Sequence, residues 1–283
     1  MRTRFQAAKA LCLTEWGGGR RNLPLVRYDG SSDVSSSFTE TLLTISQGDV
    51  TITNVTLDGR KEKVTASGSL LDIDGSTTTV TLGDGATVCN NKTSQRGSGV
   101  YISAGTFKMI GGTVTGNDAS YGGGVYADDD GTFEMSGGKI IGNTATSSYG
   151  GGGVYDRGTF KMSGGEISGN NATRGGGVYV PDAGTGIFTM TGGKIINNTA
   201  TSLGGGVYNH RTFTMSDGEI TGNTATTSGG GVYVDNSGTF TMEGGTISGN
   251  TATTSGGGVY VKTNGMFAQG GTVSGNSPDD VYP

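Results

Sequence analysis

The sequence predicts an all-β protein, a right-handed parallel β-helix in which a single chain winds through about nine or ten coils. Three observations predict this fold. A unit recurs every 25 to 28 residues, its apolar residues stand at every second position, and no ten-residue stretch has helical spacing. One such unit cannot bury its own apolar side chains. Units stacked in register about 4.8 Å apart can do so, with the right-handed sense usual for parallel connections.

Three residue types, Phe, Tyr and Asn, each recur at one position of every repeat and define its length. Their members are Phe107, Phe133, Phe160, Phe188, Phe213, Phe240 and Phe267; Tyr101, Tyr126, Tyr155, Tyr179, Tyr208, Tyr233 and Tyr260; and Asn117, Asn143, Asn170, Asn198, Asn223, Asn250 and Asn276. Seven units are therefore unambiguous.

Each unit is expected to hold three short strands, because apolar residues alternate in three separate runs. In the unit that begins at Gly229 these runs are Val-Tyr-Val, Phe-Thr-Met and the segment around Ile247. The residues expected to point inward are Val232, Phe240, Met242, Ile247 and Ala252, and those expected to point outward are Tyr233, Thr239, Thr241 and Thr251.

Glycine and asparagine are expected to form the corners of each coil. The Gly triplets fit the tightest corner, where a Cβ would clash, and stacked Asn side chains would bond to one another from coil to coil. A phosphate-binding loop would need a helix directly after the glycines, and here a Val-Tyr strand follows. Loop lengths vary at two places, after Val-Tyr (128–130 and 181–186) and after Asn-x-Ala, which marks surface loops.

The chain is expected to divide into an irregular N-terminal segment or cap, residues 1–42, and a β-helix, residues 43–283. Within the β-helix, residues 43–97 form irregular first coils and residues 98–283 form the regular repeats. No convincing signal peptide and no membrane span are visible in the sequence. The last residues would open another coil without a polar cap, which suggests a longer parent or end-to-end self-association.

Composition argues against several functions. The net charge of −5 and the Ser- and Thr-rich surface do not suit a nucleic acid partner. Cys12 and Cys89 are too few and too far apart to predict a disulfide framework or a metal site, and Cys89 is expected to be a small core or corner residue.

No catalytic, cofactor-binding or metal-binding residue is predicted. The single histidine, His210, has no supporting motif. Acidic residues recur after the Val-Tyr strand, and they are interpreted as solvated turn residues rather than calcium ligands or acid–base pairs, since their positions drift with loop length. They are Asp128, Asp129, Asp130, Asp156, Asp182 and Asp235.

The tyrosine column is the candidate ligand-binding feature. Outward rings at successive coils could stack on sugars or on the apolar surface of a partner, or they could simply stack on one another and cover the sheet. The candidate residues are Tyr179, Tyr208, Tyr233 and Tyr260. The repeated Thr-Ala-Thr triplets suggest ice binding as a remote alternative, although Lys108, Glu134 and Lys161 interrupt the threonine face.

Residues 84–283 resemble the repeats of the polymorphic outer membrane protein family and of related adhesin-like β-helix proteins. The likeness rests on units such as Ile247-Ser-Gly-Asn250-Thr-Ala followed by Gly-Gly-Gly-Val-Tyr, although Gly-Val replaces the family's Ala-Ile, and Ile or Val replaces the Phe three residues before Asn. The resemblance implies a surface-displayed or secreted stalk that is adhesive and non-enzymatic, with glycans or surface proteins of a host or the environment as partners. The alternatives are a pectate-lyase-like polysaccharide-degrading enzyme and a passive structural spacer.

Overall fold

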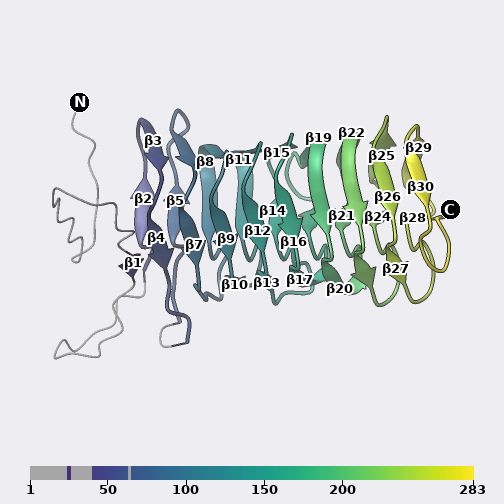
Figure 1. Cartoon of the computed structure of the whole chain (residues 1–283), viewed down its shortest axis with the longest axis horizontal. Helices are drawn as coiled ribbons and strands as arrows, with labels where there is room; N and C mark the ends of the chain where they lie inside the picture. The colour runs from purple at the N-terminus through teal and green to yellow at the C-terminus, as the bar shows by residue number, and fades with distance from the viewer. Residues whose placement is uncertain (1–23, 27–39, 63–64) are drawn as a thin grey trace.

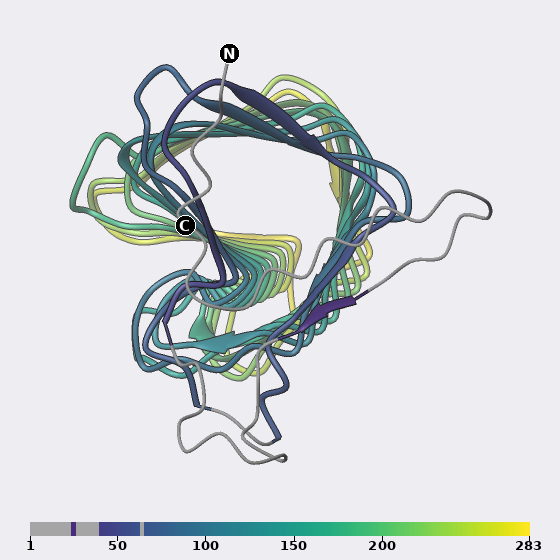
Figure 2. The same cartoon turned by 90° about the vertical axis from the view of Figure 1, so that its left-hand side faces the viewer.

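The computed structural model describes residues 24–26, 40–62 and 65–283, and it shows a parallel β-solenoid of about nine turns. All strand pairings in the described residues are parallel, and these residues include no helix. Viewed from the N-terminal end, the chain turns clockwise as it recedes, so the solenoid is right-handed (Figure 2). The predicted fold is confirmed.

Four columns of strands run along the solenoid (Figure 1), and each is named after the residue that recurs in it. The tyrosine column contains β2 (Leu43–Ile45), β5 (Leu71–Ile73), β8 (Val100–Met109), β11 (Val125–Met135), β14 (Val154–Asp156), β18 (Val178–Val180), β21 (Val207–Asn209), β24 (Val232–Val234), β28 (Val259–Val261) and β31 (Val281–Tyr282). The phenylalanine column takes the second halves of β8 and β11 and contains β3 (Asp49–Ile52), β6 (Thr79–Leu82), β15 (Thr159–Met162), β19 (Ile187–Ile196), β22 (Thr212–Thr221), β25 (Thr239–Met242) and β29 (Met266–Gln269).

The isoleucine column takes the second halves of β19 and β22 and contains β1 (Pro24–Val26), β4 (Thr56–Asp58), β7 (Thr87–Cys89), β9 (Thr113–Thr115), β12 (Lys139–Ile141), β16 (Glu166–Ser168), β26 (Thr246–Ser248) and β30 (Thr272–Ser274). The alanine column contains β10 (Asp118–Ala119), β13 (Thr144–Ala145), β17 (Asn171–Arg174), β20 (Thr199–Leu203), β23 (Thr224–Ala225) and β27 (Thr251–Ala252). This column was not predicted, because four of its six strands have only two residues and are too short to show alternation.

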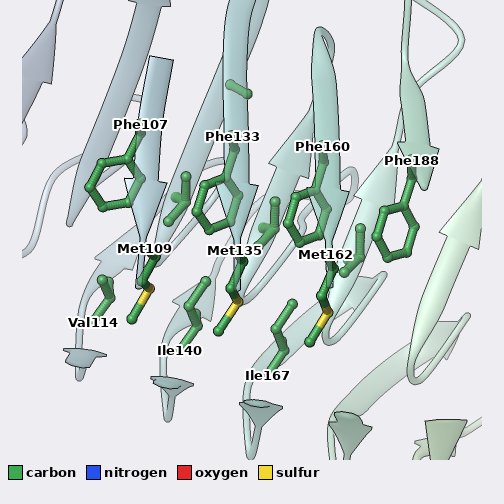
Figure 3. Packing of buried hydrophobic residues seen from close by; sticks show 14 of the residues in the cluster. Phe107, Met109, Val114, Phe133, Met135, Ile140, Phe160, Met162, Ile167 and Phe188 are labelled. Carbon is green, nitrogen blue, oxygen red and sulfur yellow. The ribbon is translucent and has the colours of Figure 1, made fainter. Parts of the chain in front are cut away.

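The core is a set of stacked side-chain columns inside the coil. Phe rings from successive coils stack with centroids 4.5–5.4 Å apart, and Met and Ile or Val columns pack beside them (Figure 3). The predicted inward residues Val232, Phe240, Met242, Ile247 and Ala252 are all buried. Thr239 and Thr241 are partly exposed and Thr251 is exposed, so the predicted register is confirmed.

A buried asparagine ladder forms the corner between the isoleucine and alanine columns. The Asn143 side chain donates from Nδ2 to Asn170 Oδ1 at 3.0 Å and to the carbonyl oxygen of Val114 at 3.0 Å, and the backbone N–H of Asn143 donates to the same Oδ1 at 2.9 Å. Equivalent bonds recur from Asn117 to Asn276. Each amide thus satisfies buried backbone groups that the corner removes from strand pairing.

The Gly triplets lie where the coil wall folds inward on one side (Figure 2). The first glycine has a positive φ, as at Gly122 (+61°). A Cβ on Gly123 would lie 2.5 Å from the carbonyl oxygen of Thr144, and one on Gly124 would lie 2.7 Å from that of Gly153. The triplets are therefore required by close backbone approach, as predicted.

The predicted N-terminal segment, residues 1–42, lies mostly outside the described residues, as does Cys12. Of this segment, β1 is described, and it pairs in parallel with β4. Cys89 is a buried free cysteine in register with Thr115, as predicted. In the described part of the chain, no helix has the length and apolarity needed to cross a membrane.

Candidate functional site

The tyrosine rings point away from the phenylalanine core, yet they are not exposed. Tyr179 and Tyr208 are only 1% exposed and Tyr233 only 5%, whereas Tyr260 is partly exposed. Together with Tyr126 and Tyr155 they form a second buried cluster in the inward fold of the coil wall. The prediction of an outward aromatic stripe is therefore wrong for the buried rings, because the inward fold encloses the side of the strand that faces away from the core.

Ring stacking covers both faces of the tyrosines from Tyr155 to Tyr260. Consecutive centroids lie 4.9 Å apart between Tyr126 and Tyr155 and between Tyr208 and Tyr233, with interplanar angles of 8° and 10°. A sugar or an aromatic ligand cannot stack on a face that a neighbouring ring already covers. The stacked rings of this column present their edges and hydroxyl groups, and not their faces, to the surroundings.

Some tyrosine hydroxyl groups are held by carboxylates. Tyr101 donates to Asp128 Oδ2 at 2.9 Å, and Tyr208 donates to Asp235 Oδ2. Burial raises the pKa of Tyr101 to about 12, with a further contribution from the bond to Asp128. Burial likewise raises the pKa of Tyr233 to about 12. These rings stay neutral throughout the physiological range of pH.

A groove with a volume of about 560 Å³ lies against the tyrosine column. We call it the tyrosine groove and define it by its lining residues. They are Arg96, Tyr121, Tyr126, Tyr149, Tyr155, Arg157, Arg174, Tyr179, Pro181, Asp182, Ala183 and His210.

The two walls of the tyrosine groove come from the two places where the repeat varies in length. Loops that follow the tyrosine column supply Arg157, His210 and the segment 181–183. Segments that precede the glycine corner supply Arg96, Tyr121, Tyr149 and Arg174, the last of which ends β17 of the alanine column. The position directly before the triplet reads Arg96, Tyr121, Gly150, Arg174, Leu203, Ser228 and Ser255 in successive coils. Large side chains therefore occupy this wall in the N-terminal and central coils, and serines occupy it in the last coils.

Three arginines of the tyrosine groove differ in how they are paired. Arg157 forms ion pairs with Asp128 at 3.1 Å and with Asp129 at 2.8 Å, and Arg96 lies 3.7 Å from Asp128. Arg174 forms no ion pair with any residue that the structure describes. Its guanidinium lies over the ring of Tyr149, 5.0 Å from the centroid, and 5.7 Å from that of Tyr208.

A cluster of ionisable groups continues the tyrosine groove beyond His210. The Asp235 carboxylate accepts a hydrogen bond from Lys262 Nζ at 3.0 Å and lies 3.5 Å from His210 Nε2. Burial lowers the pKa of the His210 imidazole, although the Asp235 carboxylate opposes this effect. Burial alone would raise the pKa of Asp235, but the hydroxyl of Tyr208, the N–H of Asn236 and the ammonium of Lys262 lower it. At neutral pH His210 is thus uncharged beside an ionised carboxylate.

The recurrent acidic residues divide into two groups. Asp129, Asp130 and Asp182 are exposed and Asp128 is partly exposed, as expected of loop residues. The prediction is wrong for Asp235, which the cluster above buries, and for Asp156, which is fully buried and faces the core. Within the described part of the chain, no group of three or more His, Cys, Asp or Glu residues could hold a metal ion.

The outer face of the phenylalanine column carries the residues that interrupt the threonine array. Glu134 lies between two lysines of adjacent coils, 3.2 Å from Lys108 and 3.5 Å from Lys161. These charges pair along the solenoid, so this part of the face is an ion-pair ladder rather than a regular threonine surface.

The sequence reasoning missed the wall residues of the tyrosine groove. The available signal was their departure from the repeat. Arg96, Tyr121, Tyr149 and Arg174 stand just before the glycine corner, where the last coils have serine, and Arg157 stands two residues after Tyr155. Residues that depart from a repeat at its variable loops are candidates for a specific site.

The fold and the tyrosine groove define the class of this protein: a right-handed parallel β-solenoid repeat protein with a lined groove along one side. Two segments, residues 217–235 and 244–262, match the family model of the Chlamydia polymorphic membrane protein repeat. Each segment runs from the isoleucine column through the asparagine corner and the Gly triplet to the tyrosine column. The resemblance found in the sequence is therefore confirmed. No curated protein and no solved structure is significantly similar to the chain.

Proposed function

We propose that this chain is a non-enzymatic stalk, surface-exposed or secreted, that adheres to a polymeric or multivalent ligand through the tyrosine groove. The observation that carries the proposal is the groove itself, whose floor repeats from coil to coil while its walls carry the residues that depart from the repeat. The match to the polymorphic membrane protein repeat supports a location at the cell surface.

A repeated floor suits a polymeric ligand. Several weak contacts along one rigid rod add up to avidity, provided that the ligand can engage them together. The tyrosine hydroxyl groups and ring edges recur at the coil spacing, so a polymer lying in the groove would meet similar contacts in successive coils.

The proposal is tested by obstructing the groove without disturbing the core. Ala183 is exposed and lines the groove, so Ala183→Trp should obstruct it and lower the binding of the full-length chain to cells and to a glycan array at least tenfold. Ala268 is an exposed residue on the phenylalanine column, and Ala268→Trp is the matched control, which should bind like the unchanged chain.

Two outcomes would contradict the proposal. If the unchanged chain binds no cell and no glycan, the passive spacer is the better reading. If both tryptophan variants bind as well as the unchanged chain while their unfolding temperatures also match it, the ligand meets another face.

One observation favours the enzyme alternative. Histidine, aspartate and tyrosine side chains meet at His210, Asp235 and Tyr208 at the edge of a groove that also carries arginines. Incubation of the purified chain with pectin and alginate tests it. If the protein shortens either polysaccharide and the His210→Gln variant does not, the protein is a polysaccharide-degrading enzyme and the stalk proposal is wrong. An unchanged length of both polysaccharides supports the stalk.

A further inference from the structure

We propose that the part of the tyrosine groove over Tyr155 is a binding site for an acidic saccharide, with Arg174 as the residue that receives its carboxylate. The inference rests on the proposed function, which it deepens by naming the ligand class and the residues. The residues that carry it are Arg96, Tyr121, Tyr149, Tyr155, Arg157 and Arg174.

Positive charge gathers in this groove although the chain is acidic. The structure describes five arginines, and three of them line the groove together with a single carboxylate, that of Asp182. The whole chain has a net charge of −5. Asp128 and Asp129 pair with Arg157, and Asp128 also lies beside Arg96. The guanidinium of Arg174 is therefore the charge in the groove that can attract an anion.

Arg174 is the arginine that the protein leaves available. Arg157 is already neutralised by Asp128 and Asp129, whereas Arg174 has no carboxylate partner among the described residues. Its Nε–H is buried and has no hydrogen-bond partner among the described residues. The guanidinium is held over the ring of Tyr149, 5.0 Å from its centroid, and lies 5.7 Å from the centroid of Tyr208. A guanidinium held in this way can bind a carboxylate through two parallel hydrogen bonds.

The surroundings of Tyr155 suit a sugar ring. Tyr155 is the most exposed of the five buried tyrosines at 8%, and the wall position of its coil is Gly150, which has no side chain. Tyr121 meets Tyr155 edge to face with centroids 5.6 Å apart, and Tyr149 is 49% exposed. These two rings lie outside the stack, so they offer the aromatic surface that the stacked column cannot. The volume of about 560 Å³ lies within the range of small-molecule sites.

A carboxylate and a sulfate are both anions that arginine binds, so the ligand arms of the test must separate them. We expect the full-length chain to bind hexagalacturonate more tightly than sulfated dextran, and to bind neither methyl-esterified hexagalacturonate nor uncharged dextran. Titration calorimetry measures all four affinities directly.

The site is tested with Arg174→Gln, which keeps the size and polarity of the side chain but removes the guanidinium. We expect at least a tenfold weaker affinity for hexagalacturonate. Lys194→Gln is the control, because it removes one positive charge from an exposed ion pair away from the groove, and its affinity should not change. Tyr121→Ser is a second variant, since Tyr121 is only partly buried and its loss should weaken binding without unfolding the chain.

Each outcome decides the inference. It is overturned if the unchanged chain does not bind hexagalacturonate, if the methyl ester binds as well as the free acid, or if Arg174→Gln and Tyr121→Ser bind normally. If sulfated dextran binds more tightly than hexagalacturonate, the inference of a carboxylate ligand is wrong and the group bound by Arg174 is a sulfate. If the chain adheres to cells but binds no acidic saccharide, the inference fails while the proposed function stands. If it does neither, both fail.

Discussion

Asp156 is an acidic residue that lies in the apolar core. It is fully buried on the core side of the tyrosine column, where Ala127 stands at the same position of the preceding coil. Neither carboxyl oxygen has a hydrogen-bond partner of good geometry among the described residues, and the nearby N–H of Gly158 offsets only part of the effect of burial. Burial raises the pKa of Asp156 well above its usual value of 3.8, so the folded chain holds a proton that the unfolded chain releases.

A pH dependence of stability follows from Asp156. Below about pH 4 the carboxyl group is protonated in both the folded and the unfolded chain, so it adds no pH dependence. Above that pH only the unfolded chain releases the proton, so the free energy of unfolding falls by up to about 1.4 kcal/mol per pH unit. Asp156→Val should remove this slope and raise the free energy of unfolding at pH 7 by about 1–3 kcal/mol. Urea titrations at several pH values between 4 and 8 measure both effects.

The control for Asp156 is Asp130→Asn, which changes an exposed carboxylate in the preceding coil and should leave the slope in place. Equal stability of Asp156→Val and the unchanged chain across the pH range would show that the buried carboxyl group has a partner in solution.

The tyrosines also show which properties of a single residue the sequence can predict. The side to which each tyrosine points was predictable, because it depends only on alternation within a strand. Its burial was not, since the inward fold of the coil wall that encloses Tyr179 and Tyr208 is not visible in the alternation of a single strand. For the same reason, Arg174 could be recognised as irregular but not as the partner of Tyr149.

At the scale of elements, the phenylalanine column is a continuous stack of rings in the core, from Phe107 to Phe267. Phe160 stacks on Phe133 and Phe188 with both centroid distances at 4.7 Å. Phe160→Ala should lower the free energy of unfolding by about 3–5 kcal/mol, because it removes a buried ring from contacts with two coils at once. Chemical denaturation measures the loss.

Thr159→Ala is the control for the phenylalanine column, since Thr159 precedes Phe160 and faces the other side of the same strand. Its cost should be about 0.5 kcal/mol or less. A comparable loss in both variants would mean that the strand is shifted by one residue in solution.

Three of the four strand columns could be predicted because their alternation is local, and the asparagine and glycine corners because their residues recur. The direction in which the Gly triplet turns could not be predicted. Its inward fold depends on backbone contacts with the next coil, such as that between Gly123 N and Gly151 O at 3.2 Å, and it is this fold that creates the groove.

At the scale of the whole molecule, each coil contacts mainly its two neighbours, so a coil should be removable. Deleting residues 229–255 would join Ser228 to Gly256 and so restore the Ser-Gly sequence that Ser255 and Gly256 form in the unchanged chain. It would also let the side chain of Asn223 bond to Asn276, as it bonds to Asn250 in the unchanged chain. We expect a folded, shorter rod that unfolds cooperatively at a somewhat lower temperature. Circular dichroism during heating measures it.

The control deletion removes residues 229–241 and therefore half a coil. It should leave the coils before residue 229 folded and prevent those after it from docking, because every later strand would enter the wrong column. The signal for strand structure should therefore be lower than that of the whole-coil deletion. Similar melting curves for the two deletions would contradict the nearest-neighbour description of the rod.

The direction of the hydrogen bonds between coils has a mechanical consequence. Bonds such as that from Val125 N to Gly153 O, at 2.9 Å, run along the rod, so tension between its ends loads the terminal coil first and peels it away before the next. A released coil of 27 residues can extend to about 90 Å, whereas it adds about 4.8 Å to the folded rod. A rod of this construction lengthens stepwise under load. Each step dissipates work while the remaining coils stay folded.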